Sequence, residues 1–168
     1  MTFGVVCVSD RCSKGVCEDK SGPLISEMLS TLGKTKKYVL VPDEKDEIEK
    51  TLIHLCDEVK INVVFTTGGT GFSPRDITPE ATKAIIEKDV PGISEAIRLK
   101  SLEITDKAML SRAVSGIRKN SLIINLPGSP KLSKKHLKLL FPFCRTLLKF
   151  FQETRLIVAV ITERGGRF

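Results

Sequence analysis

Short runs of β-branched and other apolar residues alternate along the chain with segments whose apolar residues recur at helical spacing. The first pattern is typical of buried strands and the second of amphipathic helices. Four strands are predicted in this way, over residues 4–9, 38–42, 62–67 and 121–126. Strands that alternate with helices are joined by right-handed crossovers and run parallel. We therefore expect an α/β fold, a three-layer helix–sheet–helix sandwich with a mostly parallel sheet.

The helical pattern fills the stretches between the predicted strands. It covers residues 24–32, 46–59, 78–90 and 91–102, and it resumes near Ser133. We expect Thr78 to cap its helix with a hydroxyl group, ahead of a proline and an acidic residue in the first turn. Pro142 is expected to kink or split the last helix. Residues 156–161 fit either a strand or the end of that helix.

One domain is expected over residues 1–168, with the tail beyond about residue 156 unassigned. A chain of this length can bury one hydrophobic core, whereas two domains would leave each half short of core. Hydrophobic residues make up 41% and charged residues 28%, which excludes a disordered, collagen-like or low-complexity chain.

The formal net charge is +7, from 27 Lys plus Arg against 20 Asp plus Glu. Much of it lies in two lysine clusters, which are Lys34, Lys36 and Lys37, and Lys131, Lys134, Lys135 and Lys138. Such clusters usually form a solvated face, and a functional cluster would attract an anionic partner. Single-stranded nucleic acid needs exposed aromatic side chains among basic residues. With one Tyr and no Trp the chain shows no such arrangement, so nucleic acid is not expected as a partner.

The cysteines and the apolar segments bear on the compartment. The spacing of Cys7, Cys12 and Cys17 matches no zinc site, and we expect all five cysteines to be free thiols, which indicates a reducing compartment. No stretch approaches the roughly 20 apolar residues of a membrane span. The N-terminus lacks the pattern of a signal peptide. A cytoplasmic protein is expected.

Residues suited to ligand binding follow each of the four predicted strands. They are, strand by strand, Ser9 and Asp10, Pro42 and Asp43, Gly68 to Asp76, and Pro127, Gly128 and Ser129. Each turn alone would be ordinary, because Asp, Gly, Pro and Ser are common turn residues. In open α/β sheets, however, ligands bind beyond the carboxyl ends of the strands. Four such turns at one edge predict one crevice there.

The turn Gly68-Gly69-Thr70-Gly71 carries the most specific signal in the chain. Glycines are useful where φ must be positive or where a ligand approaches the backbone closely. Bare N–H groups in such a turn form a nest for an anion. Neither the ending of a P-loop nor the third glycine of a dinucleotide fingerprint follows. The turn therefore predicts a site for phosphate or a similar anion.

Three aspartates, Asp10, Asp43 and Asp76, would lie beside this phosphate site and form a candidate magnesium site. Mg²⁺ is usually held by one or two carboxylates together with phosphate oxygens and waters. The alternative is helix capping, which Asp43 or Asp46 could perform for the helix over 46–59. Both histidines, His54 and His136, lie in helical patterns, so a Ser-His-Asp triad has no base.

Residues 66–82, TTGGTGFSPRDITPEAT, resemble the signature of the molybdenum cofactor biosynthesis family. That family includes bacterial MogA and MoaB and the G domain of gephyrin, which this chain resembles most. Further matches follow in family order, at residues 8–10, 18–22, 41–44, 109–112, 116–118 and 123–128. Residues 131–138 are more basic than the family pattern, and residues 157–168 match none of it.

The resemblance implies a molybdopterin adenylyltransferase, which converts Mg-ATP and molybdopterin to adenylyl-molybdopterin and pyrophosphate. Asp43 and Asp76 match the family's two essential aspartates and are expected to position Mg²⁺ and substrate. Arg112 is a candidate charge partner for an anionic substrate. The substrate-binding residues expected are Ser9, Asp10, Thr67, Gly68, Gly69, Thr70, Gly71, Ser111, Arg112, Pro127, Gly128 and Ser129.

The resemblance also implies assembly and partners. A homotrimer is expected, with hand-over of the product to a molybdenum-insertion protein or domain. Two alternatives within the family are a non-catalytic oligomeric scaffold and a member that binds the pterin but adenylylates poorly.

Overall fold

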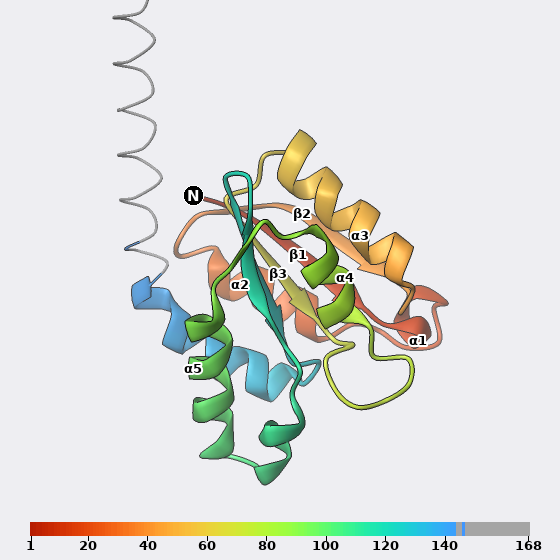
Figure 1. Cartoon of the computed structure of the whole chain (residues 1–168), viewed down its shortest axis with the longest axis vertical. Helices are drawn as coiled ribbons and strands as arrows, with labels where there is room; N and C mark the ends of the chain where they lie inside the picture. The colour runs from red at the N-terminus through yellow and green to blue at the C-terminus, as the bar shows by residue number, and fades with distance from the viewer. Residues whose placement is uncertain (144–145, 147–168) are drawn as a thin grey trace, which may run out of the picture.

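The computed structural model of the chain describes residues 1–143 and Thr146. In this part of the chain six strands form one sheet, in the order β2-β1-β3-β6-β5-β4 (Figure 1). The strands are β1 (Thr2–Val8), β2 (Lys34–Val41), β3 (Val63–Thr67), β4 (Lys88–Asp89), β5 (Ser115–Arg118) and β6 (Ser121–Leu126). β2, β1, β3 and β6 are parallel, whereas β5 is antiparallel to both β6 and β4.

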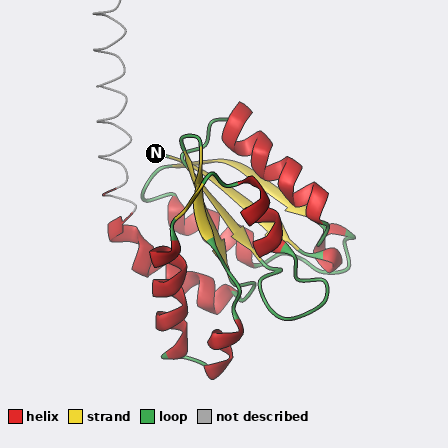
Figure 2. Cartoon of the chain, viewed as in Figure 1, coloured by secondary structure: helices red, strands yellow, loops and turns green. Residues whose placement is uncertain are grey.

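Helices connect these strands and cover the sheet (Figure 2). They are α1 (Asp10–Ser13), α2 (Ser21–Leu29), α3 (Lys45–Ile53), the π-helical turn η1 (His54–Glu58), α4 (Thr78–Ile85), α5 (Pro91–Leu102), the 3₁₀ turn η2 (Asp106–Leu110) and a helix over 130–143. Proline lies in the first turn of both α4 and α5, where its missing N–H has no helical partner to lose.

Each face of the sheet has its own apolar core, because alternate residues of a strand point to opposite sides. Phe3 and Val5 of β1 pack in one core with α2, α5 and the helix over 130–143. Val6 and Val8 of the same strand pack in the other core with α3 and α4. The sheet therefore lies between two helical layers, and the α/β sandwich predicted from the sequence is confirmed (Figure 1).

The antiparallel edge, β4 and β5, was not predicted. β4 has two residues and β5 has four, so neither is long enough to show a periodic pattern. At Gly116 a Cβ atom would lie 2.8 Å from the Lys88 carbonyl oxygen, so the pairing of these strands needs glycine there.

One expectation about the helices is wrong in detail, and another is narrowed. Ile77, not Thr78, occupies the N-cap position of α4, and no side chain caps it. The Thr78 hydroxyl instead donates to the Gly68 carbonyl oxygen at 3.0 Å, because it faces the glycine turn. The last helix runs unbroken through Pro142 to residue 143, so it is not split there, and the kink at Pro142 stays a prediction. Residues 156–161 lie outside the described part of the chain.

The lysines of both predicted clusters lie in solvent. Lys34, Lys36 and Lys37 are exposed on β2, which forms one edge of the sheet. The four lysines of the second cluster are exposed on the helix over 130–143. This exposure fits both alternatives, a solvated face and a surface that attracts an anionic partner.

Arg118 is the last residue of β5 and lies next to the start of β6, at the amino-terminal edge of the parallel strands. Its side chain bonds to two neighbouring helical segments. The Arg118 guanidinium donates through Nε and Nη2 to both carboxylate oxygens of Asp57, at 3.0 and 2.7 Å. Its Nη1 donates to the Ile85 carbonyl oxygen at 2.9 Å. β5, η1 and the end of α4 are therefore joined by one side chain.

His136 is fully buried between the helix over 130–143 and α5. Its Nε2 lies 2.6 Å from the Ser101 hydroxyl, and its Nδ1 has no partner among the described residues. Burial disfavours the charged ring and lowers the pKa of His136 from 6.5 to about 4. As the pH falls through this window, the unfolded chain binds a proton that the folded chain does not, so the free energy of unfolding decreases.

We expect His136 to make the protein acid-sensitive between about pH 6.5 and 4. The full effect of such a shift is about 3 kcal/mol. Urea unfolding across this pH range would measure it, with His136→Gln as the comparison because glutamine can still bond to Ser101. The variant should lose less stability on acidification than the wild type. Equal losses in the two proteins would contradict the assignment.

Candidate active site

The four turns predicted to converge do meet at the carboxyl edge of the parallel strands (Figure 1). Backbone bonds hold them together: the Ser9 N–H donates to the Val41 carbonyl oxygen at 2.9 Å, and the Gly68 N–H to that of Leu126 at 3.4 Å. A Cβ atom on Gly128 would lie 3.3 Å from the Gly68 Cα. The segments after β1, β2, β3 and β6 therefore form one site.

The glycine turn needs glycine for backbone and steric reasons. Gly68 and Gly69 have φ angles of 100° and 63°, which residues with a Cβ rarely adopt. A Cβ on Gly68 would collide with the Val8 carbonyl oxygen, and one on Gly69 with the Thr78 hydroxyl. In the described structure the N–H groups of Gly69, Thr70 and Gly71 donate no hydrogen bond. These unused N–H groups are compatible with the anion site expected from the sequence, which stays a prediction.

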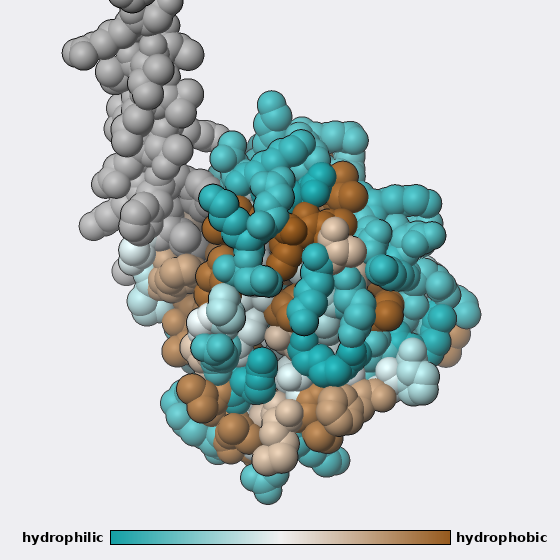
Figure 3. Space-filling model, viewed as in Figure 1, coloured by the Kyte–Doolittle hydropathy of each residue, from teal (hydrophilic) through white to brown (hydrophobic). Residues whose placement is uncertain are grey.

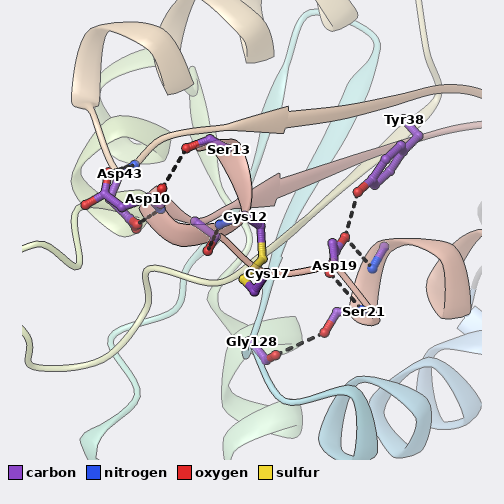
Figure 4. Close-up of a disulfide and its surroundings, with 11 residues drawn as sticks. Asp10, Cys12, Ser13, Cys17, Asp19, Ser21, Tyr38, Asp43 and Gly128 are labelled. Carbon is purple, nitrogen blue, oxygen red and sulfur yellow. Dashed lines mark hydrogen bonds between the residues drawn. A yellow bond between two sulfur atoms is a disulfide. The ribbon is translucent and has the colours of Figure 1, made fainter. Parts of the chain in front are cut away.

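Asp10 and Asp43 cap each other's backbone. The Asp10 N–H donates to Asp43 Oδ2 at 2.8 Å, and the Asp43 N–H donates to Asp10 Oδ1 at 3.1 Å (Figure 4). Arg75 donates to the two Asp10 carboxylate oxygens from Nε and Nη2, both at 3.0 Å. Its Nη2 also donates to Glu44 Oε1 at 2.7 Å. Asp43 does not cap α3, whose N-cap position is Glu44. The reciprocal pair therefore joins the turns after β1 and β2.

The two linked carboxyl groups differ in their electrostatics. Hydrogen bonds from Arg75 hold the pKa of the Asp10 carboxyl below its ordinary value. Burial raises the pKa of Asp43, and the negative charges of Asp10 and Asp76 raise it further. A positive charge between Asp43 and Asp76 would relieve this repulsion.

Asp76 also lies against the glycine turn. Its Oδ2 accepts the Ser73 N–H at 2.9 Å. A Cβ on Gly71 would lie 2.9 Å from Asp76 Oδ2, and one on Gly69 would lie 3.0 Å from Asp43 Oδ1. The two carboxylates thus flank the turn, each against one of its glycines.

The donor set fits a cation that shares its coordination with a phosphate. Among the described residues no group of three or more His, Cys, Asp or Glu side chains is arranged to hold a metal ion by itself. Two carboxylates beside an anion nest nevertheless match Mg²⁺, which takes its other ligands from phosphate and water. Asp43 and Asp76 are the residues that fit, whereas the Asp10 carboxylate is already occupied by Arg75.

A cavity of about 290 Å³ opens beside the glycine turn. Thr70, Gly71, Ser111 and Pro127 from the predicted set line it, as do apolar residues such as Leu110. Figure 3 shows hydrophobic residues gathered at this end of the molecule, around the end of α5 and η2. The cavity combines apolar walls with a few polar groups, as is typical of small-molecule sites.

Several predicted site residues hold the site together rather than point into it. The Ser9 hydroxyl caps α1 by accepting the Cys12 N–H at 3.3 Å. The Thr67 hydroxyl donates to the Pro127 carbonyl oxygen at 3.0 Å. The Ser129 carbonyl oxygen accepts the Ser133 N–H at 2.9 Å, inside the start of the last helix. The Arg112 guanidinium donates to the carbonyl oxygens of Gly71 and Asp76 and pairs with Glu80.

Asp19 and Ser21 belong to the site although the sequence analysis assigned them no role. Asp19 accepts the N–H groups of Ser21 and Gly22 at 2.8 and 2.9 Å and the Tyr38 hydroxyl at 2.8 Å. The Ser21 hydroxyl donates to the Gly128 carbonyl oxygen at 3.0 Å (Figure 4). Asp19 therefore sets the start of α2 against the turn after β6. The match of residues 18–22 to the family pattern was the sequence feature that pointed to this segment.

The expectation of free thiols throughout is wrong for one pair, since Cys12 and Cys17 form a disulfide (Figure 4). Their spacing suits no metal, but α1 turns the chain so that the two side chains meet. Cys7 and Cys56 are buried free thiols, as predicted. Burial is the main cause that raises the pKa of Cys7 to about 12 and that of Cys56 to about 11. With a disulfide present, cysteine usage no longer argues for a reducing compartment.

We expect reduction of this disulfide to lower the free energy of unfolding by about 2 kcal/mol, because the bond restricts a short loop in the unfolded chain. Chemical unfolding with and without dithiothreitol would measure the change. A variant with serine at both Cys12 and Cys17 is the control and should not respond to the reductant. A wild type equally indifferent to dithiothreitol would contradict the pairing.

Comparison with known proteins now bears on this site. The chain matches the family described as "Probable molybdopterin binding domain" over residues 4–146. A molybdopterin adenylyltransferase of Helicobacter pylori (strain J99) is 52% identical over 143 residues, which cover 83% of this chain and 81% of that protein. The molybdenum cofactor synthesis protein cinnamon of Drosophila melanogaster is 44% identical over 137 residues, 80% of this chain and 23% of that protein.

A solved structure agrees with the sequence comparisons. The molybdopterin biosynthesis enzyme MoaB of Thermus thermophilus superposes with a TM-score of 0.79 at 41% identity, over 84% of this chain and 89% of that one. The family match spans the four turns of the site and both flanking aspartates. This chain therefore belongs to the molybdopterin-binding domain family of molybdenum cofactor biosynthesis, as its signature residues predicted.

Proposed function

We propose that this protein is a molybdopterin adenylyltransferase, which joins the AMP part of ATP to the terminal phosphate of molybdopterin and releases pyrophosphate. The observation that carries the proposal is the glycine turn with unused N–H groups, flanked by Asp43 and Asp76. Relatives named molybdopterin adenylyltransferase, which this chain matches over most of their length, support it.

The proposed reaction is a displacement at phosphorus. An oxygen of the molybdopterin phosphate forms a bond to the α-phosphorus of ATP, while the bond from that phosphorus to the oxygen bridging to the β-phosphate breaks. The attacking phosphate is already ionised and needs no general base, which agrees with the absence of histidine from the described site. Catalysis then consists of positioning and charge stabilisation.

Different residues of the site would position the substrates and stabilise the charge. The N–H groups of Gly69 to Gly71 bind phosphate oxygens, and the cavity beside them takes a flat ring of the bound substrate. Asp43 and Asp76 would hold Mg²⁺. The ion neutralises phosphate charge when bound. Arg75 keeps Asp10 occupied and so leaves the other two aspartates to the cation.

Assembly, partner and location stay predictions from the family resemblance. We propose a homotrimer in the cytoplasm that delivers its product to a molybdenum-insertion protein or domain. Within the described residues, no helix has both the length and the apolar character needed to cross a bilayer. The scaffold and the poor adenylylator are the alternatives, and the assays below separate them from the enzyme.

Asp76→Asn should reduce turnover by at least about 100-fold, because it removes a charge that holds the cation while keeping an acceptor for the Ser73 N–H. The measurement is adenylyl-molybdopterin formed from molybdopterin and Mg-ATP, with oligomeric state followed by light scattering. Asp89→Asn, at an exposed position on β4, is the matched control and should be fully active. Normal turnover in Asp76→Asn would remove Asp76 from the mechanism.

Chelation should stop the reaction reversibly. EDTA is expected to abolish product formation by the wild type, and excess Mg²⁺ to restore it, because the site supplies too few ligands to bind the cation without the nucleotide. Asp43→Asn should need a higher Mg²⁺ concentration for half-maximal rate. Turnover that persists in EDTA would rule out the magnesium role, and molybdopterin binding without any product would favour a pterin-binding protein.

A further inference from the structure

We propose that Arg112 is a positioning residue that sets the place of Asp76 and the glycine turn, and that it does not bind substrate. This inference rests on the adenylyltransferase function proposed above and departs from the charge-partner role expected for Arg112 from the family resemblance. It concerns the loop from Gly71 to Asp76, called here the aspartate loop.

The Arg112 side chain is bonded to both ends of the aspartate loop. Its Nε donates to the Gly71 carbonyl oxygen at 2.7 Å, and its Nη2 donates to the Asp76 carbonyl oxygen. Its Nη1 forms an ion pair with the Glu80 carboxylate in the first turn of α4. The Arg112 N–H also donates to the Thr70 carbonyl oxygen at 3.0 Å. One residue thus fixes the glycine turn, Asp76 and α4 relative to one another.

Apart from Arg112, the main anchor of the aspartate loop is the Arg75 side chain, which donates to the carboxylates of Asp10 and Glu44. Phe72, Ser73, Pro74 and Arg75 are exposed, and the loop contains no helix or strand (Figure 2, the wide loop before α4). Within the loop, the Asp76 N–H and carboxylate both bond to Ser73, which fixes the bend but not its position on the protein. The two bonds from Arg112 close the stem of the loop and so place the Asp76 backbone.

Arg112 is itself tied to the centre of the sheet. Two residues further on, Val114 exchanges two bonds with Asn125 of β6: its N–H donates to Asn125 Oδ1 at 3.2 Å, and its carbonyl oxygen accepts the Asn125 N–H at 3.0 Å. The Asn125 amide is buried and also donates to the Thr66 and Thr82 hydroxyls, both at 2.9 Å. A rigid strand therefore positions Arg112, and Arg112 positions the loop.

These contacts argue against a role in binding substrate. Two of the three guanidinium nitrogens donate to main-chain carbonyls of the loop, and the third pairs with Glu80, so the positive charge is already matched. Three of the five N–H donors are used in this way, so a substrate phosphate can gain more than the two remaining N–H groups only by releasing the stem of the loop that carries Asp76. Lysine keeps the charge but lacks the planar fork that joins three partners at once, so Arg112→Lys separates the two roles.

The test compares Arg112→Lys with Arg118→Lys. Arg118 is a matched control because its guanidinium also binds a carboxylate and a main-chain carbonyl, but at the opposite edge of the sheet. We expect Arg112→Lys to lower kcat by about 100-fold, with KM for molybdopterin and ATP changed by less than about threefold. The Mg²⁺ concentration for half-maximal rate should rise. Arg118→Lys should lose stability and keep its kcat.

Hydrogen exchange supplies a readout that does not depend on turnover. The Asp76 and Thr78 N–H groups, which bond to Ser73 and Gly69, should exchange faster in Arg112→Lys and at the wild-type rate in Arg118→Lys. A large rise in KM with kcat preserved would overturn the proposal and make Arg112 a substrate ligand. Equal loss of kcat in both variants would also overturn it, as general weakening of the fold.

Two further measurements test the proposal if Arg112→Lys does not fold or if the wild type is inactive. If Arg112→Lys does not fold, Glu80→Gln removes only the ion pair, and the proposal requires a smaller fall in kcat with KM unchanged. If the wild type makes no product, the adenylyltransferase proposal fails by itself. Hydrogen exchange in Arg112→Lys then decides the present proposal, and unchanged exchange at Asp76 and Thr78 overturns it.

Discussion

Parallel pairing of β2, β1, β3 and β6 is the constraint on which the rest of the structure depends. It brings four chain reversals to one edge of the sheet, although they are far apart in sequence. The apolar cores on both faces hold this pairing, so the site lies on a rigid platform and not on a single loop. The turns can then consist of glycine, aspartate and proline, which add little stability of their own.

This arrangement brings several aspartate carboxylates close together. Main-chain N–H groups and arginine side chains offset their negative charge. Asp10 and Asp43 each accept a backbone N–H from the other, and Asp10 also accepts two bonds from Arg75. Asp43 is left with a raised pKa and an oxygen directed at the turn. A cation bound beside Asp43 would offset the burial and the neighbouring negative charges that raise its pKa.

The sequence predicted the platform well because long apolar runs mark buried strands, and because the residues after each run were chemically unusual. It could not predict β4 and β5, which are too short for a pattern, or the Cys12–Cys17 pairing, which depends on α1. Thr78 was assigned to a cap because local sequence favours one, but a contact with Gly68 outweighs that preference. The contacts of Arg112 join residues more than thirty positions apart, so no local pattern reveals them.

The two ends of the sheet have a consequence for how copies of the chain can meet. An open edge strand is a template onto which another chain can add by hydrogen bonding. Here β2 presents Lys34, Lys36 and Lys37 along one end, and the other end is β4, which offers only two residues. Repulsion between lysines opposes the addition of a second chain to β2, and β4 is too short to pair with one. Within the part of the chain that the structure describes, self-association by continuation of the sheet is thus disfavoured at both ends.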